Sequence, residues 1–314
     1  MTAPATSTSD SSSAGPVAWT ARQVTETDYR IRMSDAVRAE LLALLDGPAI
    51  EDSAGDRLQR AVPPGLEALM QEVRQRVLRG FGLCIVSGLP IEDLDDTLRA
   101  RLVRSVAYAF GPVIVQDVKH TRFYDVKDTG RSVQYGVRRS KTNVDQELHT
   151  DGGWLDKPAE VIALHCLAQA SNGGMSRIAS LTQAVEQMRQ EAPDLLALLE
   201  RPLPWDRQAE HPPGEQTWSE QPVLWHESSL TRLRWYRDYV QNGYKLAGQS
   251  MPDQIAEALN RFFEILARPE NVIEIQLQPG EVAWIHNQAV AHARSEFEAG
   301  SARHMVRVWH RFDV

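Results

Sequence analysis

A histidine and an aspartate that are separated by one residue could hold a metal ion in this chain. His149 and Asp151 have this spacing, which at the end of a β-strand directs both side chains to one face. His292, near the carboxyl end, could add a second imidazole. Two imidazoles and one carboxylate on one face hold non-haem Fe(II) and leave coordination positions open. Because the chain contains nine histidines, so short a motif also arises by chance, and the surrounding sequence must support it.

The elements that would position these residues can be predicted from hydrophobic periodicity. Helical periodicity indicates helices over residues 35–45, 65–78, 98–110, 183–199 (broken near Pro193) and 252–267. Strand-like runs cover residues 82–86, 161–167, 175–180, 272–277, 281–285 and 303–312. This order favours an α+β fold in which short strands form a barrel-like sheet around a polar site and helices pack outside. The stretch 202–248 has little periodicity, so we expect a long loop excursion that forms a lid or a subunit contact.

Composition limits the classes of protein to which the chain can belong. The 314 residues are 42% hydrophobic, which is enough for a large buried core. The net charge of −8 argues against a nucleic-acid partner, and no apolar run approaches the length of a membrane span. The Ser/Thr-rich amino terminus lacks the apolar region of a secretory signal, so we expect residues 1–17 to be a disordered tail. Cys84 and Cys166 lie in apolar runs and indicate buried, reduced thiols in a cytoplasmic protein.

The last predicted strand carries two arginines on one face. With a period of two, Arg303 and Arg307 share a face, and Val306 and Val308 share the other. Arginines that face the interior are costly unless anions neutralise them. Solvent or internal carboxylates could do this. A bound ligand carboxylate is the alternative, because a guanidinium holds it with two parallel hydrogen bonds.

Several segments together resemble the taurine dioxygenase/TfdA family of Fe(II)- and 2-oxoglutarate-dependent oxygenases. Residues 279–287 (PGEVAWIHN) and 290–294 (VAHAR) are similar to the carboxyl-terminal signature of that family. There the second metal histidine is followed by arginines eleven and fifteen residues later, which Arg303 and Arg307 match (303 − 292 = 11; 307 − 292 = 15). Residues 173–176 (GGMS) resemble its Gly-Gly-X-Thr/Ser turn, and residues 80–88 resemble its first core strand.

The resemblance implies a role for each matching residue. His149, Asp151 and His292 would be the iron ligands. Arg303 would bind the distal carboxylate of 2-oxoglutarate with a hydrogen bond from Ser176, where family members normally carry Thr. Arg307 would lie nearer the metal and anchor a substrate acid group or the other end of the cosubstrate. The fold implied is a double-stranded β-helix (jelly roll) with flanking helices, as one domain over residues 18–314 with a helical and loop insertion at about 182–270.

The resemblance also implies the reaction. O₂ and 2-oxoglutarate would be consumed, succinate and CO₂ released, and an unactivated C–H bond of a small molecule hydroxylated. Related halogenases have Gly or Ala at the position of Asp151, so we expect oxygenation and not halogenation. Desaturation, cyclisation and a carrier-bound or protein substrate are open variants. So are two other classes: a non-catalytic sensor on the same fold, and a zinc hydrolase, because two His and one Asp also suit Zn²⁺.

Residues before and after the His-X-Asp motif give clues to the substrate. Seven basic residues lie between 119 and 141: Lys119, Arg122, Lys127, Arg131, Arg138, Arg139 and Lys141. They indicate either a solvated loop or a basic entrance, including Arg138, for a carboxylate, sulfonate or phosphorylated compound. Trp154 and Tyr135, with acids such as Asp145, could instead hold an amine by cation–π contact or simply pack. A zwitterion would satisfy both patterns.

Three other histidines have predicted places. His165 lies within the run 161–167 and is expected to be a packed strand residue. His286 and His310 lie near the proposed ligands in sequence, so hydrogen bonds to the metal ligands are possible for them. A homo-oligomer is also possible.

Overall fold

The computed structural model describes residues 15–46, 61–134, 136–227 and 230–312. Most of the predicted disordered tail, and Tyr135, therefore lie outside the described residues. The end of that predicted tail is placed on the fold, because the Val17 amide donates to the carbonyl of Gly80 at 2.8 Å. None of the described helices has the length and apolar character needed to cross a bilayer.

Two β-sheets form the centre of the structure. The larger has seven strands in the order β1-β2-β13-β6-β15-β3, with β4 also paired to β15. Its strands are β1 Arg30–Arg32, β2 Leu83–Ser87, β3 Val113–Ile114, β4 Phe123–Val126, β6 Val161–Ala168, β13 Val282–His286 and β15 His304–His310. The smaller has the order β12-β7-β14-β5, with β5 Gln146–His149, β7 Ser176–Ser180, β12 Val272–Ile275 and β14 Val290–Arg294. All pairs except β1–β2 are antiparallel.

The two sheets face each other across a shared apolar layer. Ile85 and Ile285 of the larger sheet lie in one buried cluster with Ile178 and Ile275 of the smaller sheet. The strands thus have the two-sheet arrangement of a jelly roll. The predicted α+β jelly-roll core with flanking helices is confirmed, and its described strands form two facing sheets without one closed barrel.

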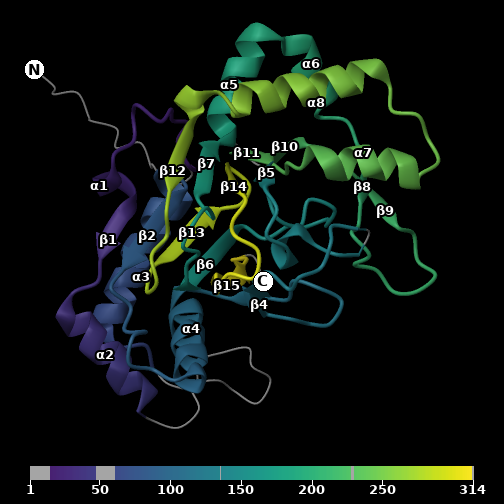
Figure 1. The fold of residues 1–314 in the computed structure, drawn as a ribbon. Helices are drawn as coiled ribbons and strands as arrows, with labels where there is room; N and C mark the ends of the chain where they lie inside the picture. Colours follow the sequence, from purple (N-terminus) through teal and green to yellow (C-terminus); the bar gives the residue numbers. More distant parts are fainter. Residues whose placement is uncertain (1–14, 47–60, 135, 228–229, 313–314) are drawn as a thin grey trace, which may run out of the picture.

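Helices cover the outer face of each sheet (Figure 1). Strand alternation places Trp284 on the outer face of the larger sheet, against α2 Asp35–Leu45, α3 Pro64–Arg79 and α4 Asp96–Phe110. On the smaller sheet Ala179 and Ala291 lie in a second cluster with Phe262. This side carries α5 Leu181–Glu191, α6 Pro193–Leu198, α7 Arg237–Leu246 and α8 Asp253–Leu266. Each apolar strand face is therefore buried, which is the condition for a stable layered fold.

The predicted helices agree with the structure, including the break at Pro193. That proline is the first residue of α6, the position where its missing N–H costs no hydrogen bond. Side-chain caps define two helix starts: Asp95 accepts from the Leu98 amide at 2.8 Å, and Ser180 accepts from the Gln183 amide at 3.1 Å.

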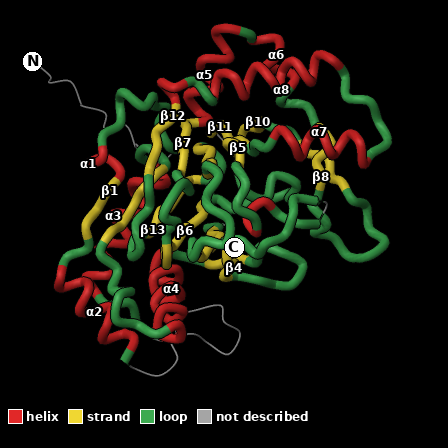
Figure 2. The backbone as a smooth tube through the Cα atoms, in the orientation of Figure 1, coloured by secondary structure: helices red, strands yellow, loops and turns green. Residues whose placement is uncertain are grey.

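The long excursion expected over 202–248 consists largely of short regular elements. The segment contains α7 and two hairpins, with strands β8 Leu203–Asp206, β9 Trp218–Gln221, β10 Leu224–Glu227 and β11 Leu230–Leu233. These elements are too short for periodicity to reveal them. The remaining short elements are α1 Glu26–Tyr29, η1 Arg139–Lys141 and η2 Pro269–Asn271. In Figure 2 long loops gather between β4, β5 and β8, at the end of the sheets where the predicted site residues lie.

Buried histidines should make the stability of the fold depend on pH. His165 is packed within β6 as predicted, with both ring nitrogens buried and without a hydrogen-bond partner among the described residues. Burial, with repulsion from His310, lowers the pKa of His165 to about 3. Burial also lowers the pKa of His286 to about 3 and that of His310 to about 4. These imidazoles are therefore neutral in the folded protein at pH 7.

Replacing His165 by leucine should weaken this pH dependence. The unfolded state takes up a proton near the ordinary pKa of 6.5, whereas folded His165 resists protonation until about pH 3. The His165 contribution to stability is therefore complete above pH 6.5 and is lost as the pH falls toward 3. We expect the loss to reach a few kcal/mol by pH 4 in the wild type.

Urea unfolding at several pH values between 7 and 4 measures this effect. His165→Leu should show a smaller loss of unfolding free energy than the wild type over this range. His226→Gln, at an exposed side chain, is the control and should keep the wild-type slope. Equal slopes for His165→Leu and the wild type would contradict the prediction.

Candidate metal centre

Two neighbouring strands bring the predicted metal ligands together. His149 ends β5 and His292 lies in the middle of β14, where the two are direct cross-strand partners. Their ring centroids are 4.2 Å apart. Asp151 follows β5 in a turn that continues through Gly152 at φ 68°, a conformation that favours glycine. One potential ligand atom from each of His149, Asp151 and His292 lies within 4.8 Å of the others, and all three residues are buried.

Hydrogen bonding prepares His149 to bind a metal through Nε2. Its Nδ1 lies 2.8 Å from the carbonyl oxygen of Glu147, so the proton on Nδ1 is donated there and the lone pair remains on Nε2. The Gln146 amide nitrogen is 2.9 Å from Nε2, a contact that a bound ion would replace. His292 Nδ1 is buried without a hydrogen-bond partner in the described part of the chain. A buried ring nitrogen without a hydrogen-bond partner is unusual, so the ring nitrogens of His149 and His292 are better explained as metal ligands than as parts of a complete hydrogen-bond network.

The charges of the three ligands are those that a divalent metal requires. Burial lowers the pKa of His149, and burial together with His149 lowers that of His292 to about 3. For Asp151, burial raises the pKa, but the charge of Arg307 and the hydrogen bond from Trp309 lower it, and the pKa lies at about 2. Near neutral pH the set is therefore two neutral imidazoles and one carboxylate, the protonation state that metal binding needs.

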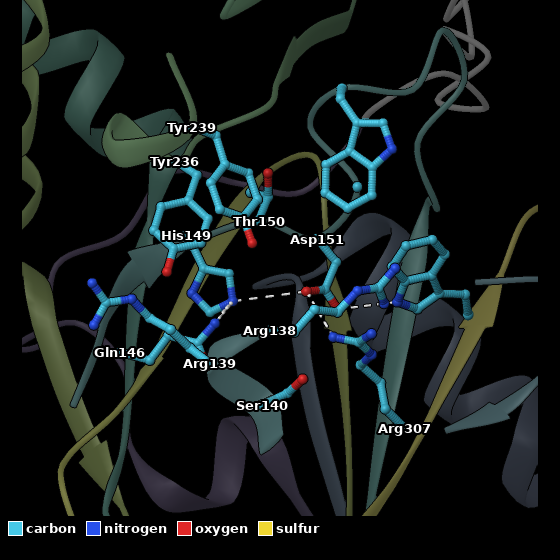
Figure 3. Close-up of a pocket in the computed structure, with 13 residues that line it drawn as sticks. Arg138, Arg139, Ser140, Gln146, His149, Thr150, Asp151, Tyr236, Tyr239 and Arg307 are labelled. Atoms are coloured by element: carbon cyan, nitrogen blue, oxygen red, sulfur yellow. Dashed lines mark hydrogen bonds and ion pairs between the residues drawn. The ribbon is translucent and has the colours of Figure 1, made fainter. Parts of the chain in front are cut away.

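Asp151 is held through both its carboxylate and its backbone. Arg307 Nη1 donates to Oδ1 at 3.1 Å, and Trp309 Nε1 donates to Oδ2 at 3.0 Å. Figure 3 shows the carboxylate between His149 and Arg307. Asn287 Oδ1 accepts from the Asp151 amide at 2.8 Å, and its Nδ2 donates to the Asp151 carbonyl at 3.0 Å. Sequence reasoning gave Asn287 no role, although it directly follows His286 in the signature segment 279–287.

The segment 202–248 also borders the metal centre. The Thr150 amide donates to the Trp235 carbonyl at 2.7 Å, and Thr150 Oγ1 accepts from the Trp235 amide at 2.8 Å. The Tyr236 ring centroid is 4.9 Å from that of His149, and the Tyr236 and Tyr239 rings stack at 4.0 Å. The start of α7 thus packs directly over a metal ligand.

Two buried arginines, Arg294 in β14 and Arg303 just before β15, have no carboxylate partner among the described residues. Arg303 is 4% exposed, and its Nε and Nη1 have no hydrogen-bond partner within the described ranges. Arg294 shares its surroundings, since the guanidinium carbons of Arg294 and Arg303 lie 4.7 and 5.2 Å from the Phe297 ring centroid. Neither forms an ion pair with a described carboxylate. Burial lowers the pKa of each to about 10, so both stay charged and favour an anionic ligand.

An apolar cavity lies between the sheets beside His292. It is lined by His292 and Ser176 and by aliphatic side chains that include Leu164, Ile178, Ile275 and Leu277. Ser176 is the first residue of β7. Gly174, at φ 69°, precedes it, and a Cβ there would lie 3.0 Å from Arg303 Nε, so glycine allows the turn to approach that arginine. The Ser176 hydroxyl and the aliphatic walls beside His292, together with the partly unpaired Arg303 next to Gly174, fit a short dicarboxylate such as 2-oxoglutarate.

A second pocket opens on the side of Arg307. Its lining includes five predicted site residues, namely His149, Asp151, Trp154, Arg307 and Arg138, together with Arg139 of the basic segment. Of the other predicted substrate contacts, Asp145 does not line this pocket and Arg139 already has a carboxylate partner. Asp145 is exposed, pairs with Arg177 at 2.6 Å and does not line the pocket, so the predicted substrate contact of Asp145 lacks support. Arg139 is paired with Asp238 at 3.2 Å.

His286 and His310 do not contact the metal ligands. His286 Nε2 lies 3.1 Å from Arg232 Nη1, and His310 Nδ1 lies 3.2 Å from the Pro112 carbonyl. Their side chains serve packing and local hydrogen bonding away from the triad. The predicted faces of β15 are confirmed in part, because Val306 and Val308 pack under the helices while Arg307 faces Asp151.

Replacing Asn287 by alanine should weaken metal binding without removing a ligand. The change deletes both hydrogen bonds that fix the Asp151 backbone, and we expect Fe(II) affinity to fall on the order of tenfold to a hundredfold. Anaerobic Fe(II) titration followed by calorimetry measures the affinity. Asn260→Ala, on the exposed face of α8, should bind Fe(II) like the wild type. Wild-type affinity in Asn287→Ala would show that this clamp is dispensable.

Known proteins are similar to this chain in sequence and in fold. The model of the family "Taurine catabolism dioxygenase TauD, TfdA family" matches residues 50–309. The chain is 27% identical to FR-33289 synthase of Streptomyces rubellomurinus, covering 94% of this chain and 89% of that protein. It superimposes on asparagine oxygenase bound to Fe(II), 2S,3S-3-hydroxyasparagine and succinate with a TM-score of 0.68, at 16% identity over 90% of this chain and 93% of that one.

The non-haem iron oxygenase OrfP, in complex with Fe and alpha-ketoglutaric acid, gives a TM-score of 0.66 at 14% identity, over 90% of this chain and 93% of that one. The family match covers most of the sequence, and the two facing sheets are those of the jelly-roll oxygenases. The chain belongs to the TauD/TfdA family of Fe(II)- and 2-oxoglutarate-dependent oxygenases.

Proposed function

We propose that this oxygenase hydroxylates an unactivated C–H bond of a small anionic or zwitterionic metabolite, with His149, Asp151 and His292 as its iron ligands. The observation that carries the proposal is the convergence of these three side chains, whose ligand atoms lie within 4.8 Å of one another. Three ligands on one face leave open positions for a cosubstrate and O₂. Bound iron and 2-oxoglutarate supply the oxidising chemistry, with release of succinate and CO₂, and the protein supplies placement and charge.

Each of the surrounding residues has a proposed task. Arg303 binds the distal carboxylate of 2-oxoglutarate, because its Nε and Nη1 are buried and have no partner among the described residues. Ser176, which lines the apolar cavity beside His292, adds a hydrogen bond to the same carboxylate. The aliphatic side chains of that cavity exclude water from the cosubstrate chain. Arg307 keeps Asp151 ionised and extends toward the second pocket.

The second pocket is the proposed substrate site. Arg307 and Arg138 bring positive charge to it, and Trp154 brings an aromatic wall. The asparagine oxygenase complex contains a hydroxylated amino acid, which is a zwitterion and supports this class. We also propose that residues 18–314 act as one domain. Free, buried Cys84 and Cys166 support the reducing cytoplasm as its location.

Coupled turnover tests the proposed reaction. With Fe(II), 2-oxoglutarate and O₂, a panel of amino acids, carboxylates, sulfonates and phosphonates should include a compound that stimulates succinate release and gains one oxygen atom. Asp151→Gly should lower this turnover by at least a thousandfold, an order of magnitude expected when a group essential to the chemistry is lost. Full turnover in that variant would remove Asp151 from the site. Substrate binding without succinate release would favour a sensor, and Zn²⁺-supported hydrolysis would favour a hydrolase.

The two buried arginines beside Phe297 allow a matched test of cosubstrate binding. Arg303→Gln should raise the KM for 2-oxoglutarate at least tenfold and leave Fe(II) affinity unchanged, because it removes the charge opposite a buried carboxylate. Arg294→Gln should have a smaller effect, since Arg294 Nη2 already donates to the Val144 carbonyl. Steady-state kinetics with varied 2-oxoglutarate gives both values. A larger effect at Arg294 would transfer the role to that residue.

A further inference from the structure

We propose that Ser140, together with Arg138 and Arg307, forms a subsite for an oxyanion group of the substrate: a carboxylate, sulfonate or phosphonate. The inference rests on the proposed function, because it concerns the pocket that also contains the metal ligands. Its new element is Ser140, which matches no part of the family signature. All three residues line the same pocket as His149 and Asp151, and Figure 3 shows them grouped on the side of Asp151 that faces Arg307.

Three hydrogen-bond donors in this pocket are buried and unused. Ser140 Oγ, Arg138 Nε and Arg307 Nη2 each lack a partner among the residues the structure describes. Ser140 is 6% exposed and Arg307 7% exposed, and the Arg138 side chain is 10% exposed. Buried donors without acceptors are unfavourable. Three of them along one pocket indicate a ligand that brings several acceptor oxygens.

The two arginines are fixed relative to each other before any ligand binds. Gln116 connects them, because its Oε1 accepts from Arg307 Nε at 2.8 Å and its carbonyl accepts from Arg138 Nη2 at 3.3 Å. Both guanidinium groups also lie over the Tyr124 ring, with carbon-to-centroid distances of 4.9 Å for Arg307 and 5.4 Å for Arg138. Such a rigid pair loses little entropy when it binds an anion.

The geometry of η1 explains why Ser140, and not its neighbours, reaches the pocket as a free donor. Arg139, the residue before it, is engaged by Asp238. Lys141, the residue after it, donates to the Asp125 carbonyl and lies 4.2 Å from the Tyr124 centroid. Ser140 alone of the three is buried and keeps its hydroxyl free.

The charge of this region also favours an anion. Arg138 has one carboxylate partner, Glu210, at 2.5 Å, and Arg307 has one, Asp151, at 3.1 Å. When Asp151 binds a divalent cation, its negative charge is shared between the cation and Arg307. The positive charge of Arg307 is then less fully neutralised. The positive charge of this region also affects Lys141, because burial lowers the pKa of Lys141 and the charges of Arg307 and Arg138 lower it further. An oxyanion beside the metal would therefore restore the local charge balance.

Binding of small probe anions tests the subsite without requiring the natural substrate. Protein loaded with Fe(II) and 2-oxoglutarate in the absence of O₂ is titrated in a calorimeter with acetate, methanesulfonate and methylphosphonate. The wild type should bind at least one probe. Ser140→Ala and Arg138→Gln should each weaken that binding about tenfold or more, as expected for a lost hydrogen bond to a charged group.

Two matched controls come from the same basic segment. Ser132→Ala and Arg131→Gln change the same residue types at exposed positions outside the pocket and should bind the probe within twofold of the wild type. The preferred probe tells a planar carboxylate from a tetrahedral oxyanion.

Binding of Fe(II) and 2-oxoglutarate is measured in every variant, so that a folding failure cannot be mistaken for a lost subsite. Failure of the wild type to bind iron or 2-oxoglutarate would overturn the proposed function itself. If both bind, the subsite is overturned by an absence of probe binding, or by Ser140→Ala and Arg138→Gln binding like the controls. For a substrate identified by the turnover panel, both variants should raise KM far more than they lower kcat, since they act on binding of a remote group.

Discussion

The pairing of β5 with β14 is the constraint on which the rest of the site depends. It sets His149 directly opposite His292, and a register shift of one residue would turn either imidazole to the other face of the sheet. The pairing is secured from both sides, because β14 also pairs with β7 and its Ala291 and Ala293 pack under the helices. Two ligands are thus fixed by the sheet, and only Asp151 depends on a turn, which Asn287 and Thr150 anchor.

Burial of charge explains why this interior needs its ligands. Arg294 and Arg303 are buried without carboxylate partners among the described residues, whereas Arg307 is paired with Asp151. A desolvated guanidinium is costly unless an anion lies beside it. The apolar cavity borders the triad at His292, Arg303 approaches Gly174 two residues before Ser176 of its lining, and the polar pocket contains Arg307. A dicarboxylate and an anionic substrate would each complete one of these regions, so binding relieves a cost that folding alone leaves in place.

Features set by local periodicity could be predicted from the sequence, and features set by distant contacts could not. The alternation of β15 follows from strand geometry and agrees with the structure. The spacing of His149 and Asp151 predicts their shared site, although the turn after β5, and not the strand, places Asp151 there. Asp145 has the charge of a site residue, but it turns to Arg177 at the surface. Asn287 and Gln116 matter because they contact residues far away in the sequence. Ser140 matters because its buried hydroxyl has no partner among the described residues. Neither property can be predicted from the neighbouring sequence. The short α7 and its hairpins were missed for the related reason that their stability comes from packing.

Arg307 joins the two halves of the site through a single guanidinium. Its Nη1 donates to the proposed metal ligand Asp151 and its Nε to Gln116, while its Nη2 has no partner among the described residues. An anion bound at Nη2 would compete with Asp151 for the charge of the same group. The carboxylate would then be freer to donate electron density to the metal when substrate is present than when it is absent. Under the proposed assignments, substrate binding and metal ligation would therefore be coupled through one side chain, which strand β15 holds in place.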